Sequence, residues 1–105
     1  METPNLNYIK EISANDLSFQ ESLISILKKE FPEEVSTFKK NYKNKDFIET
    51  AANIHKLKHK ISILGLAKGF ELASDFENQI KKGKTELYSD FINVLNIIDV
   101  YLGGK

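Results

Sequence analysis

The sequence predicts an all-α protein: an up-down four-helix bundle preceded by a short extra N-terminal helix. Apolar residues recur at steps of three and four along almost the whole chain, and no stretch alternates strictly between apolar and polar residues as a half-buried strand does. The polar joints between the periodic segments are short, which favours antiparallel neighbours. With 105 residues, the chain has the length of one domain with one core, residues 1–105.

The first two helices are a short lead-in and a long helix. The lead-in is expected over residues 6–12. The long helix can be capped by Asp16, or by Ser18 with Glu21 completing a capping box, because either side chain can accept a hydrogen bond from a free backbone N–H. Its apolar stripe consists of Phe19, Leu23, Ile26, Leu27, Phe31, Val35, Phe38 and Tyr42. The stripe crosses Pro32, and since proline removes one backbone hydrogen bond, we expect a kink or a break just before it.

Three further helices follow, each with its own apolar stripe. The third covers residues 47–64 and ends near Gly65, since glycine readily adopts the left-handed conformation past a helix end. The fourth covers residues 66–80 and is closed by Gly83, and Thr85 can cap the fifth. The phenylalanines expected in the core are Phe19, Phe31, Phe38, Phe47, Phe70, Phe76 and Phe91. The tyrosines expected at the bundle boundary are Tyr8, Tyr42, Tyr88 and Tyr101.

Composition and charge exclude several classes of function. Without cysteine, the chain has no disulfides, thiolate metal sites or cysteine nucleophiles. Fifteen basic residues, all lysine, balance fifteen acidic ones, so no global field attracts nucleic acid or anionic lipid. The N-terminus does not resemble a leader peptide, and no apolar run approaches the ~20 residues that span a bilayer. We therefore expect a cytoplasmic protein that binds neither nucleic acid nor membrane. Because the apolar stripes leave no surplus apolar surface, we also expect a monomer.

Two histidines are the leading candidates for chemistry. His55 and His59 are four residues apart, which places them on one face of the third helix, together with Ser62. Histidine is the side chain that changes charge nearest to neutral pH. Seven lysines lie between residues 39 and 60, against only two acidic residues, so the middle of the chain is a local positive patch. An exposed imidazole among ammonium groups is well placed to hold an anion.

The run AANIHKLKHKISILG, residues 51–65, resembles the signature of histidine phosphotransfer (HPt) domains. That signature is an alanine-rich turn, then His-x-Leu-Lys-Gly, and a glycine ten residues after the histidine. The positions that match in register are His55, Leu57, Lys58 and Gly65. Further agreement comes from Asp16-x-x-Phe19, Phe31-Pro32 and Phe76-Glu77. The resemblance covers nearly the whole chain, and its specificity is concentrated in residues 51–65.

The resemblance implies a concrete function. HPt domains are four-helix bundles with a short extra N-terminal helix that carry a phosphoryl group between receiver-domain aspartates in two-component signalling. His55 would be the phosphoacceptor, attacking an aspartyl phosphate through a neutral ring nitrogen, and Lys58 would offset charge on the phosphoryl oxygens. The partners would be response-regulator receiver domains or a hybrid sensor kinase, bound transiently. Such domains have no kinase or phosphatase machinery, and the Mg²⁺ belongs to the receiver, so no cofactor is expected on this chain.

One position departs from the signature, because His59 stands where the family has glycine. This ring either narrows the set of receivers or itself contacts the phosphoryl group. The candidate receiver-docking face consists of Lys56, His59, Ser62 and Glu77. Glu77 either frames the site from the neighbouring helix or is a solvated carboxylate, and Lys56 and Lys60 are interpreted as general surface charge.

Two alternatives stay open. A catalytically silent relative would keep the bundle and dock a receiver domain without accepting a phosphoryl group. A helical metal-binding protein would use His55 and His59, but such a pair needs a third ligand, and the sequence offers no obvious one. We therefore predict no metal site.

Overall fold

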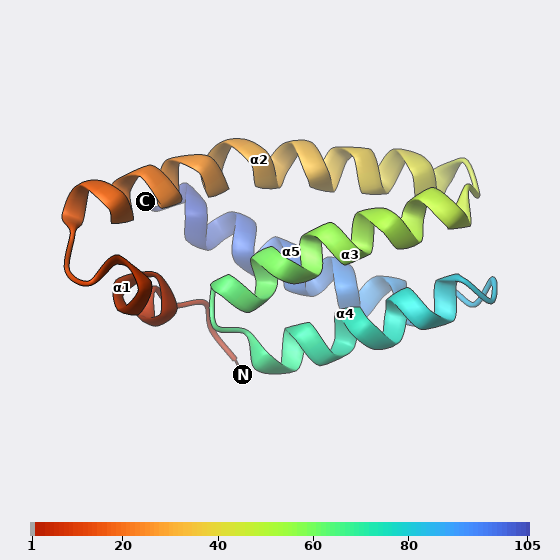
Figure 1. Ribbon diagram of the computed structural model, residues 1–105. Coiled ribbons are helices and arrows are strands. Elements are labelled where there is room, and N and C mark those ends of the chain that lie inside the picture. The colour runs from red at the N-terminus through yellow and green to blue at the C-terminus, as the bar shows by residue number, and fades with distance from the viewer. Residues whose placement is uncertain (1) are drawn as a thin grey trace.

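The computed structural model describes residues 2–105, which form a bundle of helices (Figure 1). The helices are α1 (Asn7–Ser13), α2 (Leu17–Lys43), α3 (Phe47–Ile63), α4 (Ala67–Ile80) and α5 (Tyr88–Gly103). The chain reverses direction at each joint between α2 and α5, and α1 packs against the beginning of α2. No strand occurs in residues 2–105, so the predicted all-α bundle with a short N-terminal helix is confirmed. Within the same range, none of the helices combines the length and apolar character needed to cross a membrane.

The core is built from the predicted stripes. Its largest fully buried side chains are Phe31, Phe38, Phe76, Phe91, Ile9, Ile54, Leu57, Ile61, Leu64, Ile80, Leu95 and Ile98. The Phe38 ring of α2 meets Phe76 of α4 and Phe91 of α5 edge-on, at centroid distances of 6.3 and 5.3 Å. Such aromatic pairs add about 0.5–1.5 kcal/mol to the free energy of area burial. Three helices are therefore held together at one aromatic centre.

The N-terminal end of α2 differs from the prediction. Phe19 and Ile26, expected in the core, are 45% and 48% exposed, and Leu17 is 69% exposed. The reason is length: α2 has 27 residues and α3 has 17, so α2 is longer by roughly 15 Å at the helical rise of 1.5 Å per residue. Its first turns extend beyond α3 (Figure 1). The expectation that the stripes leave no surplus apolar surface is therefore wrong at this end.

The break that we considered at Pro32 is absent, because α2 is continuous from Leu17 to Lys43. Phe31 and Phe38, on either side of the proline, are 1% and 0% exposed in the same core. Burying two such rings contributes about 1.5–3 kcal/mol each, which offsets the ~3 kcal/mol that proline costs inside a helix. Tertiary packing therefore outweighs the local cost of the proline.

The helix ends confirm some predicted signals and correct another. Asp16, rather than Ser18, caps α2 by accepting a hydrogen bond from the Phe19 N–H at 3.1 Å. Gly65 ends α3 with φ +80°, as predicted. Thr85 is not a side-chain cap: α5 begins only at Tyr88, whose N–H is bound by the Thr85 carbonyl at 3.1 Å. The chain forms a turn before α5, so the threonine hydroxyl lies too early in the sequence to cap it.

Candidate functional site

The two histidines project from α3 because of how this helix is buried. Its inner face includes Ile54, Leu57 and Ile61, which are all fully buried. Since side chains three and four residues apart share a face, this burial turns His55 and His59 outward. Both are exposed, and the His55 side chain is 53% accessible. The predicted exposed flank of α3, which also includes Ser62, is confirmed.

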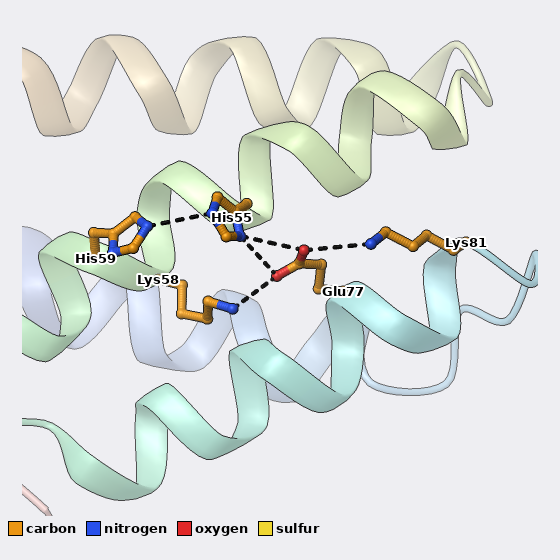
Figure 2. A network of polar contacts seen from close by, with 5 residues as sticks. All are labelled: His55, Lys58, His59, Glu77 and Lys81. Carbon is orange, nitrogen blue, oxygen red and sulfur yellow. Dashed lines mark hydrogen bonds and ion pairs between the residues drawn. The ribbon is translucent and has the colours of Figure 1, made fainter.

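Glu77 of α4 lies beside His55 of α3, although 22 residues separate them (Figure 2). Nδ1 of His55 is 3.3 Å from Oε2 of Glu77 and 3.4 Å from Oε1. The same carboxylate binds the Lys58 ammonium at 3.0 Å, and the Lys81 ammonium lies 3.6 Å from Oε2. Of the two predicted readings of Glu77, the structure supports the one that frames the histidine.

The surroundings keep Glu77 ionised. Burial raises the pKa of this carboxyl, but the hydrogen bonds from Lys58 and His55, the Lys58 charge and the charge that His55 carries when protonated lower it by more, so the pKa lies below its ordinary value of 4.5. An ionised carboxylate only accepts hydrogen bonds, so its contact with His55 requires a proton on Nδ1. In the neutral ring this leaves the lone pair on Nε2, the nitrogen that faces away from Glu77.

Lys58 is held more firmly than an ordinary surface lysine. Its side chain is only 15% exposed, and its ammonium lies 5.5 Å from the centre of the Phe70 ring in addition to its contact with Glu77. A cation over an aromatic face is attracted by the negative face of the ring. The structure therefore places a fixed positive charge on the same carboxylate that binds His55.

His59 lies one helical turn after His55, and the two rings are in direct contact (Figure 2). Their Nε2 atoms are 3.3 Å apart, and the ring planes are nearly perpendicular, at 88°. One Nε2 must carry a proton for this contact to be a hydrogen bond. His59, the residue that departs from the HPt signature, therefore contacts Nε2 of His55, the nitrogen that keeps the lone pair in the neutral ring.

The remaining lysines of α3 point toward α2. Lys60, interpreted from sequence as general surface charge, is only 14% exposed and binds Glu34 at 2.6 Å and Glu30 at 3.1 Å. That interpretation is wrong for Lys60, because the sequence could not show which residues α2 presents to it. Lys56 is exposed and lines a shallow hollow with Glu33 and Glu34. Of the predicted docking residues, Glu77 and His59 contact His55, whereas Lys56 lies toward α2.

The Lys60 cluster also changes a pKa. Burial lowers the pKa of the Lys60 ammonium, but the hydrogen bonds to Glu34 and Glu30 and their charge raise it by more, so the pKa lies above 10.5. Oε1 of Glu34 is buried without a hydrogen-bond partner. This cluster is a structural link between α2 and α3.

The chemistry that this site offers comes from its own side chains. Within residues 2–105, no group of three or more histidine, aspartate and glutamate side chains is arranged to hold a metal ion. What the site offers is an exposed imidazole, His55, oriented through Nδ1 by a carboxylate that also contacts the ammonium groups of Lys58 and Lys81. A scan against family models, a search of the curated proteins and a search of the solved structures found no match for this chain.

Proposed function

We propose that this protein is a histidine-containing phosphotransfer domain. His55 accepts a phosphoryl group from the aspartyl phosphate of one receiver domain and passes it to the aspartate of another. The observation that carries the proposal is the contact of the exposed His55 ring with Glu77 through Nδ1, at 3.3 Å. It supports the proposal because a nucleophilic imidazole needs a free lone pair on one nitrogen and an orienting partner on the other.

The transfer step follows from this arrangement. The Nε2 lone pair of His55 forms a bond to phosphorus, and the bond from phosphorus to the aspartyl oxygen breaks, so its electron pair leaves with the carboxylate. The ring then carries a positive charge, which the Nδ1–H shares with the Glu77 carboxylate. A carboxylate that orients an imidazole and stabilises its cation has the same role in hydrolytic triads. The return step reverses these bonds on a second receiver.

Lys58 supports the reaction as a charge partner. The phosphoryl group adds negative oxygens beside His55, and the ammonium of Lys58 is held one turn away by Glu77. A lysine ammonium can approach such oxygens without the fixed geometry that arginine requires. The kinase and phosphatase machinery, including Mg²⁺, belongs to the partners.

The partners that fit this surface are receiver domains, docked transiently in the cytoplasm. Their phosphorylation pocket is acidic in the HPt relays that this chain resembles. Lys58 and Lys81 contact Glu77 beside His55, and Lys56 is exposed on the α2 side of the same helix, so opposite charge would guide the encounter. His59 and Ser62 extend the same exposed flank of α3 and are proposed to contact the receiver.

A second candidate function is a docking module that binds a receiver without phosphotransfer. One observation favours it: Nε2 of His59 lies 3.3 Å from Nε2 of His55, where a phosphoryl group would be attached. In this alternative the second imidazole silences the nucleophile and the same surface only binds the partner.

Intact mass measurement separates the two candidates. The native chain and His55→Gln are incubated at neutral pH with phosphoramidate or with a phosphorylated receiver. The proposal expects one acid-labile phosphoryl adduct on the native chain and none on His55→Gln, whose exposed position makes the substitution compatible with the fold. If neither chain is modified while the receiver is demonstrably phosphorylated, the docking alternative replaces the proposal. An adduct on both chains would show that another residue is the acceptor.

A further inference from the structure

The hydrogen-bond donors around His55 can be assigned in order. Glu77 is ionised and accepts from Nδ1 of His55, so Nε2 of the neutral His55 ring carries no proton. The contact of 3.3 Å between the two Nε2 atoms then has one possible donor, the Nε2–H of His59. For neutral rings, the chain of hydrogen bonds runs from His59 to His55 to Glu77, with a proton assigned to Nε2 of His59 and to Nδ1 of His55.

We infer that His59 is a positioning residue of the phosphorylated state: its Nε2–H transfers its hydrogen bond from His55 to the phosphoryl group and prolongs the lifetime of phosphohistidine. This inference rests on the proposed function of His55. When the nitrogen–phosphorus bond forms, the Nε2 lone pair is consumed, and the donor of His59 loses its acceptor. The atoms that then occupy the space beside His59 are the phosphoryl oxygens. A hydrogen bond to such charged oxygens is roughly twice as strong as one between neutral groups.

Among the polar side chains around His55, His59 is the one that contacts Nε2; the Lys58 ammonium adds charge near the phosphoryl group but is held at Glu77. Glu77 faces the opposite ring nitrogen of His55, and Lys58 and Lys81 both contact Glu77. Lys60 is bound to Glu34 on α2, and Lys56, one turn before His59, lines a hollow with Glu33 and Glu34 of α2. His59 is the side chain whose hydrogen-bonding nitrogen already lies against the atom that becomes phosphorylated.

A donor on the phosphoryl oxygens slows the loss of the group. Phosphoryl transfer passes through a loose, metaphosphate-like transition state. As the nitrogen–phosphorus bond breaks, its electron pair leaves with the imidazole, so the phosphoryl group, which bears two negative charges in phosphohistidine, approaches a single one spread over its oxygens. A hydrogen bond to those oxygens is therefore stronger in phosphohistidine than in the transition state for hydrolysis. Removing it should shorten the lifetime about threefold to tenfold, the change in rate that corresponds to one net hydrogen bond.

The experiment compares His59→Leu with His59→Gln. Leucine fills a similar space without a donor, whereas the glutamine amide nitrogen is the same number of bonds from Cβ as Nε2 of histidine and keeps the donor. Each chain is loaded with phosphoramidate, whose phosphorus–nitrogen bond breaks to release ammonia as the bond to His55 forms. The phosphoramidate is then removed, and the decay of the phosphorylated mass is followed at neutral pH. The inference expects His59→Leu to lose phosphate threefold to tenfold faster than the native chain, and His59→Gln to decay close to the native rate.

Other outcomes overturn the inference in distinguishable ways. If all three chains carry the phosphoryl group with equal lifetimes, or if glutamine decays as fast as leucine, the role of His59 is wrong and the function of His55 stands. If the native chain never takes up the group, the proposed function fails, and this inference fails with it.

¹⁵N spectra of the unphosphorylated imidazoles give a further check, because Nε2 of His59 and Nδ1 of His55 should carry the protons. Protons on the opposite nitrogens would also overturn the inference.

Discussion

Helix α3 carries two lysine–carboxylate clusters that look alike and differ in consequence. Lys58 binds Glu77 of α4 at 3.0 Å, and Lys60 binds Glu34 of α2 at 2.6 Å. The two lysines are 15% and 14% exposed, so neither is a free surface charge. In the first cluster the Glu77 carboxylate also contacts an exposed histidine, whereas in the second cluster the lysine is shared by two carboxylates of α2, Glu30 and Glu34. An ion pair between helices therefore becomes part of a candidate reaction site only when it also orients a nucleophile.

Neutralising one carboxylate in each cluster should produce the largest difference between the two clusters. Glu77→Gln should slow phosphoryl acceptance by His55 about tenfold to a hundredfold, because a charge-assisted hydrogen bond to the ring is replaced by a neutral one. Glu34→Gln is the matched control, since it changes the same atoms in the Lys60 cluster and should leave acceptance unchanged. Acceptance is measured as the initial rate of adduct formation with phosphoramidate. Equal rates for the two variants would show that Glu77 has no role beyond structure.

Replacing the two lysines should give the next largest effects. Here the Lys60 variant should lose more stability, whereas the Lys58 variant should lose more phosphoryl acceptance. Lys60→Met should lower the free energy of unfolding by about 1–2 kcal/mol, between the values for exposed and buried ion pairs, because Glu34 loses its cation in a partly buried place. Lys58→Met should lower it less, since Glu77 keeps Lys81 and His55 as neighbours. Phosphoryl acceptance should fall several-fold in Lys58→Met and stay native in Lys60→Met.

Chemical denaturation and the acceptance assay, applied to both methionine variants, measure these two quantities separately. Circular dichroism first establishes that each variant keeps its helical content. The distinction between the clusters fails if Lys58→Met destabilises the protein more than Lys60→Met does while leaving phosphoryl acceptance unchanged.

Much of the fold could be predicted because its signals are local. The periodic burial of Ile54, Leu57 and Ile61 follows directly from the spacing of apolar residues, and it determines the exposed side of α3. The exposure of Phe19 could not be read in this way, since it depends on how far α2 extends beyond its neighbours. The position of Thr85 failed for a related reason: the turn before α5 delays the helix start.

The residues at the centre of the candidate site could be predicted from the sequence, but their contacts with the neighbouring helices could not. His55 and Lys58 are found from the spacing of a short motif on one helix. The contact of Nδ1 with Glu77 joins residues 22 positions apart, and the Lys60–Glu34 pair joins residues 26 apart, so both depend on helix packing. A resemblance between sequences therefore singled out His55 and Lys58 as candidates, while only the folded chain reveals the carboxylate that contacts both and the separate link that Lys60 makes to α2.

The smallest expected effect is on the pH dependence of stability. Glu77 has a pKa below its ordinary 4.5 in the folded chain, so its contribution is present above that pH and is lost as the pH falls through the folded pKa. Lys60 has a pKa above its ordinary 10.5, so its contribution is present below that pH and is lost as the pH rises through the folded pKa. Denaturation at pH values between about 3 and 11 should therefore show a loss of stability at both ends.

The variants assign each end to one cluster. Glu77→Gln should flatten the acid side of the profile, and Lys60→Met should flatten the alkaline side. Burial and the nearby Tyr42 also raise the pKa of Tyr88, which adds its own alkaline loss, so Tyr88→Phe is measured to subtract that contribution. If Lys60→Met keeps the alkaline loss that remains after this subtraction, the Lys60 cluster does not stabilise the fold through its charge. The two clusters would then differ less than their geometry indicates.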